Sequence, residues 1–303
     1  MFYNDLNSYL KTKYGVKIYK LSIDGGLTCP NRDGTLGTRG CIFCSDNGSG
    51  EFAETPCGNI AEQLEKAKKR VESKNKDGKY IAYFQSFTNT YGDIKYLERI
   101  YREAIAPDYI VGLSVATRPD CLGDEVISLL SEINKIKPVS IELGLQTIHQ
   151  KTADYIRRGY KTEVFDNTVK RLKAAGIETV AHLILGLPGE SEKMMLETVN
   201  HVGKLGVNGV KFHLLYIIRG TDLEKDYKAG LFSTLGMEEY VDLLEKCIKA
   251  LPKDVIIHRL TGDGAKRDLI APLWSADKKK VLNYIKKRFE SDCLIQGSEH
   301  AKG

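Results

Sequence analysis

Short apolar runs alternate with amphipathic segments along most of the chain. The apolar runs predict strands, and the segments between them, in which apolar residues recur every three to four positions, predict helices. The strands are expected at 16–23, 80–85, 110–116, 138–145, 178–185 and 208–215. The helices are expected at 5–14, 60–74 (with Asn59 as its N-cap), 93–105, 124–134, 148–157 with 162–175, and 192–204.

Strands that alternate with helices at this spacing are typical of parallel β/α units. The nearly unbroken apolar character of the strands predicts that both faces of the sheet are buried. Six units are fewer than the eight of a closed barrel, so the sequence predicts an α/β fold with a partial (βα)6 TIM-like barrel over residues 1–230. Beyond residue 230 the pattern changes to a helix at 237–250, a short strand at 255–258 and a helix from Asp277. Residues 231–303 are therefore expected to form a small α/β C-terminal extension.

Composition narrows the class of protein further. The 303 residues are 42% hydrophobic and 28% charged, and no apolar run is long enough for a membrane helix. Together with an N-terminus that lacks a signal-peptide pattern, this predicts a cytoplasmic protein with no membrane partner. Seven cysteines, three of them clustered, fit a reducing compartment better than a disulfide framework. The net charge of +5 permits an RNA partner without requiring one.

The clustered cysteines lie in the loop after the first predicted strand. Eleven residues separate Cys29 from Cys41, and two separate Cys41 from Cys44. Three thiolates are one short of a closed four-thiolate site, so a [4Fe-4S] cluster here would keep one iron open for another ligand. The alternative is a four-thiolate structural zinc site completed by Cys57. Three glycines are expected to take the positive-φ turns that wrap such a loop around a metal site: Gly34, Gly37 and Gly40.

Further motifs follow the cysteine loop in a fixed order. They are SVATRPD (114–120), ELGLQT (142–147), RRGY (157–160), LILGLPGE (183–190) and HRLTGDG (258–264). With these motifs, over about residues 15–290, the chain resembles the radical S-adenosylmethionine (radical SAM) superfamily. Within it, the resemblance is to the branch of the Elongator catalytic subunit and the oxygen-independent coproporphyrinogen oxidases. The commonest spacing in the superfamily has three residues between the first two cysteines, and the longer loop here matches the Elongator-like branch.

The resemblance implies a mechanism and a set of cofactors. Cys29, Cys41 and Cys44 would bind three irons of a [4Fe-4S] cluster, and S-adenosylmethionine would chelate the fourth. Reductive cleavage of S-adenosylmethionine would release a 5′-deoxyadenosyl radical that abstracts hydrogen from the substrate. Phe43 resembles the aromatic residue that covers the cluster in this family, and an electron donor such as flavodoxin or ferredoxin would be a partner.

Three residues at strand ends are candidates for contact with S-adenosylmethionine. Gln85 ends the second strand and is placed to hydrogen-bond the methionyl end, unless it makes only a loop contact. Glu142 and Gln146 lie on the fourth strand, where an acidic residue contacts the cofactor in the resembling families. A carboxylate inside the apolar run VSIELGL is costly to bury without a donor, which favours a functional role for Glu142.

Three further candidates lie in the later motifs. Arg118 could pair with a carboxylate of the cofactor or form a structural ion pair. Arg158 lies in the RRGY turn, which resembles a segment near the cofactor ribose, although an exposed arginine at a helix end is common. His182 points to cofactor or substrate if it faces the barrel lumen, and otherwise is a core histidine.

The resemblance also suggests a substrate class. The Elongator subunit belongs to an enzyme that modifies wobble uridines of tRNA, which makes tRNA a candidate substrate. The basic segment KKKVLNYIKKR (278–288) could follow phosphates or be a solvated helix face. The alternatives are a radical SAM enzyme for a small metabolite such as a tetrapyrrole, and a non-catalytic RNA-binding protein stabilised by zinc.

Overall fold

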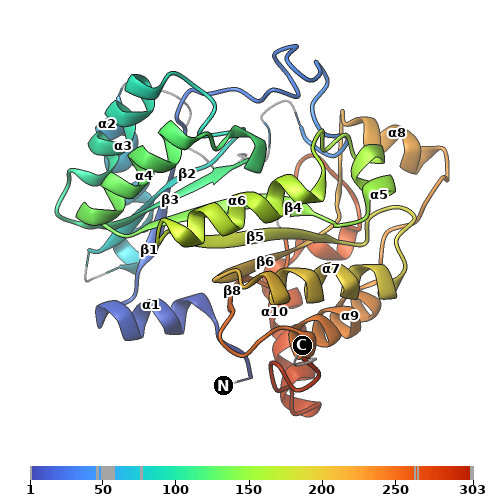
Figure 1. The fold of residues 1–303 in the computed structure, drawn as a ribbon. Helices are drawn as coiled ribbons and strands as arrows, with labels where there is room; N and C mark the ends of the chain where they lie inside the picture. Colours follow the sequence, from blue (N-terminus) through green and yellow to red (C-terminus); the bar gives the residue numbers. More distant parts are fainter. Residues whose placement is uncertain are drawn as a thin grey trace.

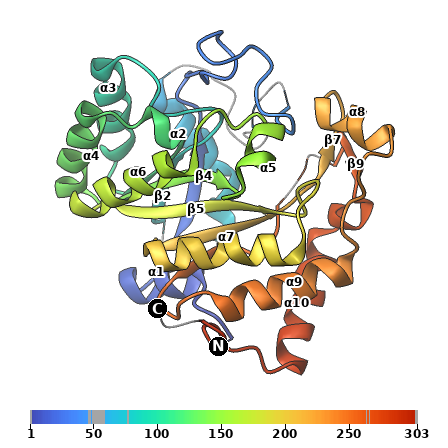
Figure 2. The same ribbon diagram turned by 45° about the vertical axis from the view of Figure 1, so that its right-hand side comes forward.

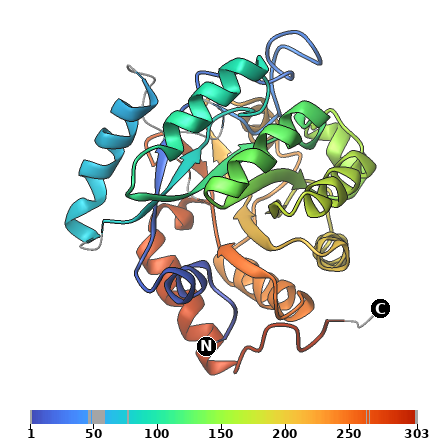
Figure 3. The same ribbon diagram turned by 60° about the vertical axis from the view of Figure 1, so that its left-hand side comes forward.

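Seven parallel strands form one curled sheet (Figures 1 and 3). The computed structural model describes residues 2–45, 48, 59–75, 78–262, 264 and 266–300. The strands lie in the order β1-β2-β3-β4-β5-β6-β8, so β1 and β8 are the edges of a half-barrel. They are β1 (Tyr19–Ile23), β2 (Tyr80–Phe84), β3 (Ile110–Thr117), β4 (Val139–Gln146), β5 (Glu178–Leu185), β6 (Gly209–Leu214) and β8 (Ile256–Arg259). This arrangement confirms the predicted α/β partial barrel.

The two faces of the sheet differ in character. On β4, Val139, Ile141 and Leu143 are buried in the main hydrophobic core, whereas Glu142 and Gln146 line a cavity on the opposite face. Successive side chains of a strand point to opposite faces, so the apolar row meets the outer helices and the polar row meets the lumen. Glu142 is itself buried on this inner face, so both faces of β4 carry buried residues, but the inner face is polar and borders a cavity.

Helices cover the outer face of the sheet (Figure 3). Asn59 accepts a hydrogen bond from the backbone N–H of Glu62 at 2.9 Å, which confirms it as the N-cap of the helix that follows. The helices between the strands are α2 (Ile60–Val71), α3 (Ile94–Ile105), α4 (Asp124–Ile136), α5 (Gln150–Tyr155), α6 (Thr162–Ala174), α7 (Glu192–Leu205), α8 (Asp222–Lys228) and α9 (Met237–Ala250). Short 3-10 helices are η1 (Glu72–Lys74), η2 (Pro119–Cys121) and η3 (Leu273–Ala276).

The C-terminal part of the chain contributes to the main sheet. Its short strand, predicted at 255–258 within the extension, is β8, which pairs with β6 as the seventh strand. A half-barrel of six strands would leave the edge of β6 unpaired, and the apolar residues Ile256 and Ile257 let β8 cover it. The sequence did not predict α8, nor the two-stranded antiparallel sheet of β7 (Ile217–Ile218) and β9 (Leu269–Ala271), which lie together in Figure 2. The division of the chain at residue 230 stays a prediction.

The seam between β1 and β8 is covered by the two ends of the chain. Helix α1 (Leu6–Tyr14) and helix α10 (Lys278–Ser291) both contribute residues to a cavity at this seam. The backbone N–H of Ile257 donates to the carbonyl of Asn4 at 2.8 Å, and the Asn4 N–H donates to the Gln296 side chain at 2.8 Å. The termini consequently lie at the same end of the molecule (Figure 1). Among the described residues, no helix has the length and apolar character needed to span a membrane.

Candidate active site

The cysteine loop leaves the C-terminal end of β1 and borders the lumen. Cys29, Cys41 and Cys44 are all partly exposed and line one cavity of about 190 Å³, into which the inner faces of β2 to β6 also project. A backbone hydrogen bond of 3.0 Å from Cys44 to Cys41 closes the tight turn between these two residues. The structure therefore brings the three sequence-distant thiols to one side of the lumen, as the loop prediction required.

Two of the three loop glycines have the predicted backbone conformation. Gly34 has a φ of 95° and Gly40 a φ of 70°, the left-handed region that favours glycine. Gly37 does not have a positive φ, so that prediction is wrong. Its N–H donates to the carbonyl of Pro30 and its own carbonyl accepts from Gly34, and these bonds close the turn in an ordinary conformation.

Asn31 fastens the cysteine loop to the turn that follows α5. Its side-chain amide donates to the carbonyl of Arg157 at 2.7 Å and lies 3.5 Å from the Cys41 sulfur. A hydrogen bond from Cys44 lowers the pKa of Cys41 to about 6, against the effect of burial and with help from the nearby Arg118 guanidinium. The same hydrogen bond, together with burial, raises the pKa of Cys44 well above its usual value.

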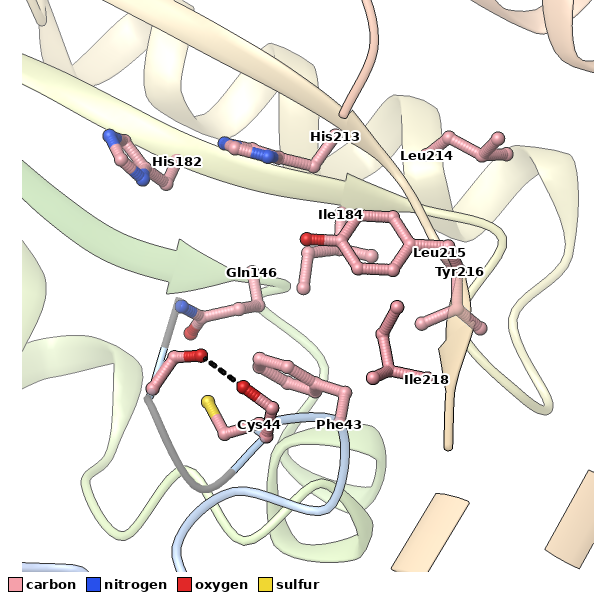
Figure 4. A pocket seen from close by; sticks show the side chains of 12 residues that line it. Phe43, Cys44, Gln146, His182, Ile184, His213, Leu214, Leu215, Tyr216 and Ile218 are labelled. Carbon is pink, nitrogen blue, oxygen red and sulfur yellow. Dashed lines mark hydrogen bonds between the residues drawn. The ribbon is translucent and has the colours of Figure 1, made fainter. Parts of the chain in front are cut away.

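A second cavity of about 110 Å³ adjoins the first and shares several lining residues with it (Figure 4). Phe43, Ile184 and Tyr216 give this second cavity an apolar lining. Cys44 and Gln146 also line it, and Cys44 lies beside Phe43 (Figure 4). We refer to the two cavities together as the chamber. It is lined by the three cysteines, by the apolar residues of the second cavity and by polar residues around Glu142.

Gln146 has features of a ligand-binding residue. Its side-chain oxygen is buried without a hydrogen-bond partner among the described residues, and its backbone has a φ of 63°. Strained, unsatisfied residues of this kind concentrate at functional sites. A Cβ at Gly144 would lie 2.6 Å from the Gln146 side-chain nitrogen, so glycine at 144 makes room for this amide.

Glu142 lies deeper, near the middle of β4, and is 1% exposed. Its carboxylate accepts hydrogen bonds from Lys20 at 2.6 Å, Tyr83 at 2.8 Å and Ser114 at 3.0 Å. His182 lies 2.9 Å away, and Lys211 also contacts the carboxylate. Burial alone would raise the pKa of Glu142, but the ammonium groups of Lys20 and Lys211 hold it well below its usual value. The predicted cost of burying this carboxylate is thus met by protein donors from β1, β2, β3, β5 and β6.

The two candidate arginines have different surroundings. Arg118 lines the chamber and forms a two-pronged ion pair with Asp120, at 2.9 and 2.7 Å. This is the structural ion pair that the sequence left open. Arg158 is 1% exposed, and its guanidinium donates to the carbonyls of Leu145, Thr147 and Tyr160. Arg158 thereby fixes the end of β4, so the alternative of an exposed arginine at a helix end does not hold, whereas its contact with the cofactor stays a prediction.

Three side chains complete the chamber from β2, β5 and β6. Gln85 directly follows β2, and its backbone N–H is bonded to the carbonyl of Ile23 at 3.1 Å. His182 and His213 lie side by side with their ring centres 5.2 Å apart (Figure 4). Burial lowers the pKa of His182 to about 4, so it is neutral at pH 7. The Nε2 atom of His213 has no partner among the described residues.

Sequence reasoning missed the cations that surround Glu142. Lys20 and Lys211 reach it from β1 and β6, and Arg259 at the end of β8 lines the same cavity. Each occupies a strand with a buried apolar face, and a lysine inside such a strand is as anomalous as Glu142 itself. A charged residue inside an apolar strand was therefore a usable signal for all of these positions, but it was applied only to Glu142. Cys57, the possible fourth zinc ligand, and Asp263 of the HRLTGDG motif lie outside the described residues.

Comparison with known proteins identifies the family. The sequence profile of the Radical SAM superfamily matches residues 34–202, and that of the Radical_SAM C-terminal domain matches residues 207–291. The chain belongs to the radical SAM superfamily. This radical SAM chain is 42% identical to Uncharacterized protein YtqA of Bacillus subtilis, over 97% of this chain and 92% of that protein.

The relation to Elongator-type proteins is also confirmed. The chain is 28% identical to the tRNA uridine(34) acetyltransferase of Methanocaldococcus jannaschii, over 50% of this chain and 28% of that protein. A solved structure of Elp3 from Methanocaldococcus infernus superposes with a TM-score of 0.71 and 18% identity, covering 92% of this chain and 64% of that one. The half-barrel is therefore the radical SAM fold.

Membership of the superfamily decides the cofactor question. The protein is a radical SAM enzyme, and its cofactors are a [4Fe-4S] cluster and S-adenosylmethionine. Within the described ranges, no three His, Cys, Asp or Glu side chains converge on a single metal ion. The thiolates of a four-iron cluster bind separate irons. The unpartnered Gln146 oxygen, beside three cysteines in one chamber, fits a chamber that holds a polar cofactor. Because the chain is a radical SAM enzyme, the non-catalytic alternative is set aside.

Proposed function

We propose that this radical SAM enzyme modifies tRNA at a uridine by abstracting a hydrogen atom. The observation that carries the proposal is the stretch of 156 residues that the chain shares, at 28% identity, with the tRNA uridine(34) acetyltransferase. A position in the wobble uridine of the anticodon is the specific target that this likeness favours.

In this proposal the cysteine loop holds the cluster through Cys29, Cys41 and Cys44. When bound, the cluster and S-adenosylmethionine supply a carbon-centred radical that removes hydrogen from the substrate. The geometry supports the loop assignment because the three thiols share one cavity wall and Asn31 fixes their turn. An electron donor is required, and flavodoxin or ferredoxin is the proposed class.

The polar residues of the chamber divide into two proposed groups. Gln146 and Gln85 contact S-adenosylmethionine directly, because they line the chamber and Gln146 has a free acceptor. Arg118, Glu142, Arg158 and His182 were also expected to bind the cofactor. Of these, Arg118 lines the chamber, whereas Glu142, Arg158 and His182 act mainly by positioning. Arg158 donates to three carbonyls near the end of β4, and the Glu142 carboxylate already accepts from several donors. His182 is held against that carboxylate.

The apolar side of the chamber suits an adenine ring. Phe43 and Tyr216 offer aromatic surface, and Ile184 offers an aliphatic one. An apolar pocket with a few polar groups is the usual setting for a nucleoside. The protein's contribution is to orient the bound nucleoside and to keep water from it.

Helix α10 supplies a candidate surface for RNA. Val281, Ile285 and Phe289 are buried against the body of the protein, and the lysines before and between them are exposed. The exposed lysines are Lys278, Lys279, Lys280, Lys286 and Lys287. Such a basic stripe attracts the phosphate backbone without reading sequence.

Two measurements test the proposal. Cluster-loaded enzyme, S-adenosylmethionine and reductant are incubated with bulk tRNA, and 5′-deoxyadenosine formation and the mass of tRNA nucleosides are followed. We expect tRNA to increase 5′-deoxyadenosine and a uridine to change mass, with neither effect in Cys44→Ala. A new nucleoside that also forms without S-adenosylmethionine, or no tRNA-dependent change at all, would refute the substrate assignment.

The binding surface has its own test. Replacing Lys279, Lys280 and Lys287 by alanine should weaken tRNA binding and reduce the slope of log K against log salt by about one for each phosphate that is no longer neutralised. The matched control is Lys193→Ala, another lysine with an exposed side chain, on α7. An unchanged slope in the triple variant would place the RNA elsewhere on the protein.

A further inference from the structure

The part of the chamber around Glu142 carries more positive than negative charge. Three cationic side chains, Lys20, Lys211 and Arg259, belong to the polar cluster around Glu142 or to the cavity that it lines. Glu142 is the sole carboxylate among the described residues lining that cavity. Glu142 offsets only part of this positive charge, so the cluster can accept a further anionic group.

Arg259 is the least satisfied of the three cations. Lys20 and Lys211 each have an ion pair with Glu142, whereas no described carboxylate or carbonyl pairs with the Arg259 guanidinium. Arg259 is opposite Lys211 in the register of β6 and β8, so its side chain belongs to the same layer of the lumen. A guanidinium with free donors is suited to a carboxylate or phosphate, which it can bind through two parallel hydrogen bonds.

Two neutral histidines add further unpartnered atoms within the described residues: His258 in this layer, and His213, which lies two residues beyond Lys211 on β6 and closer to the cysteine loop. The Nε2 of His213 and the Nδ1 of His258 are buried without partners among the described residues. Burial holds the pKa values of both histidines well below the usual range, so these rings remain neutral and can each donate one N–H. They offer hydrogen bonds to an anion without adding charge.

The state of Lys211 reflects the same imbalance. Burial, together with the charges of Lys20 and Arg259, lowers its pKa to about 7 despite the contact with Glu142. An anion bound beside Lys211 would favour its protonated form.

We propose that this layer of the lumen binds the anionic group, a carboxylate or a phosphate, of a small substrate, with Arg259 as its principal partner and Lys211 as the second. The layer lies deeper than the cysteine loop, because Lys211 is two residues before His213 on β6 and Glu142 is four residues before Gln146 on β4. The anion site is therefore distinct from the residues proposed for S-adenosylmethionine.

Arg259 also borders a route into this layer. It lines the seam cavity of about 430 Å³ between β1 and β8, together with Lys20 and His258. None of the described residues that line the seam cavity belongs to the cysteine loop, so a small anion can reach the guanidinium without passing the cofactor. This inference goes beyond the proposed tRNA reaction and does not depend on tRNA being the substrate.

The test uses cluster-loaded protein with S-adenosylmethionine at saturation, so that the cofactor's own carboxylate site is filled. Sodium phosphate and sodium acetate are titrated separately by calorimetry at pH 6.5 in low chloride. We expect one saturable site for at least one of them, weakened about 10- to 100-fold in Arg259→Gln and less strongly in Arg259→Lys, which keeps the charge but loses the two parallel hydrogen bonds. Saturation by phosphate alone points to a phosphate ester, and saturation by acetate alone points to a carboxylate.

The matched control is Arg267→Gln, which makes the same charge change in the same segment on a side chain that is 86% exposed. It should bind both probes as the parent does. Absence of saturable binding of either probe, equal binding by Arg259→Gln, or an equal loss in Arg267→Gln would overturn the proposal. None of these readouts involves tRNA, so the proposed reaction can fail while the anion site stands, and the reverse.

Discussion

Replacing Glu142 with glutamine tests the polar network of the lumen directly. The substitution keeps the size of the side chain and removes a carboxylate that is 1% exposed. Lys20, at 2.6 Å, and Lys211 would then face a neutral amide in place of their counter-ion. The substitution therefore leaves cations buried without creating a cavity.

The magnitude follows from the cost of an unpaired buried charge. Removing one partner of a buried ion pair costs about 3–5 kcal/mol of the free energy of unfolding. Because the pKa of Lys211 is already about 7, this group can release its proton, which places the expected loss near the lower end, about 3 kcal/mol. At about 2–4 °C per kcal/mol, the Tm should fall by about 6–12 °C.

The assay is thermal unfolding of anaerobic, cluster-loaded protein at pH 7, followed by circular dichroism. The control is Glu178→Gln, whose half-exposed carboxylate pairs with Lys13 at 3.3 Å. An exposed pair contributes about 0–1 kcal/mol, so this variant should lose no more than about 4 °C. Adding Lys211→Met to Glu142→Gln should restore at least about 1 kcal/mol, because it removes one stranded cation. If the Tm of Glu142→Gln falls no more than that of Glu178→Gln, the buried network does not stabilise the protein in the way argued.

Three further outcomes are expected. Because burial lowers the pKa of His182 from 6.5 to about 4, the unfolded chain binds a proton between these pH values that the folded chain does not. The free energy of unfolding of cluster-free protein should thus decrease as pH falls through this window, by up to about 3 kcal/mol, and His182→Gln should flatten the decrease. Cys41→Ala should abolish iron loading, measured by iron and sulfide analysis, whereas Cys293→Ala, at an exposed cysteine, should load fully; full loading of the first refutes the ligand assignment. Gly144→Ala should push the Gln146 amide aside and raise the Kd for S-adenosylmethionine about tenfold with little change in Tm, and an unchanged Kd argues against contact by Gln146.

The elements that sequence predicted well are those whose periodicity is local. Helices α3 and α6 and strand β5 agree closely with the predicted ranges, because their apolar spacing is unbroken. Strand β8 was found but assigned to the extension, since four residues carry no information about the strand they will pair with. The register of β8 on β6 is a tertiary choice that no local pattern records.

The candidate site was likewise predicted only where the signal lies in a local stretch of sequence. The cysteines were found from spacing alone, and the structure places them on one wall. Glu142 was recognised as unusual, and Arg158 was named only from its motif. Their partners, side chains from several strands for Glu142 and backbone carbonyls for Arg158, could not be predicted. Lys20 and Lys211 were not assigned to the site, although a lysine inside an apolar strand is as unusual as Glu142, because the sequence does not show which strands meet around the carboxylate.

The contact between Asn4 and β8 has a consequence for how the protein must be handled. Residues 4 and 5 behave as a fragment of an additional strand, since Asn4 accepts from Ile257 and Asp5 forms an isolated parallel bridge to the same residue. They shield hydrogen-bonding groups that would otherwise template pairing with another molecule. Removing the first five residues should therefore promote self-association at high concentration before it affects the cysteine loop, which leaves the carboxyl end of β1.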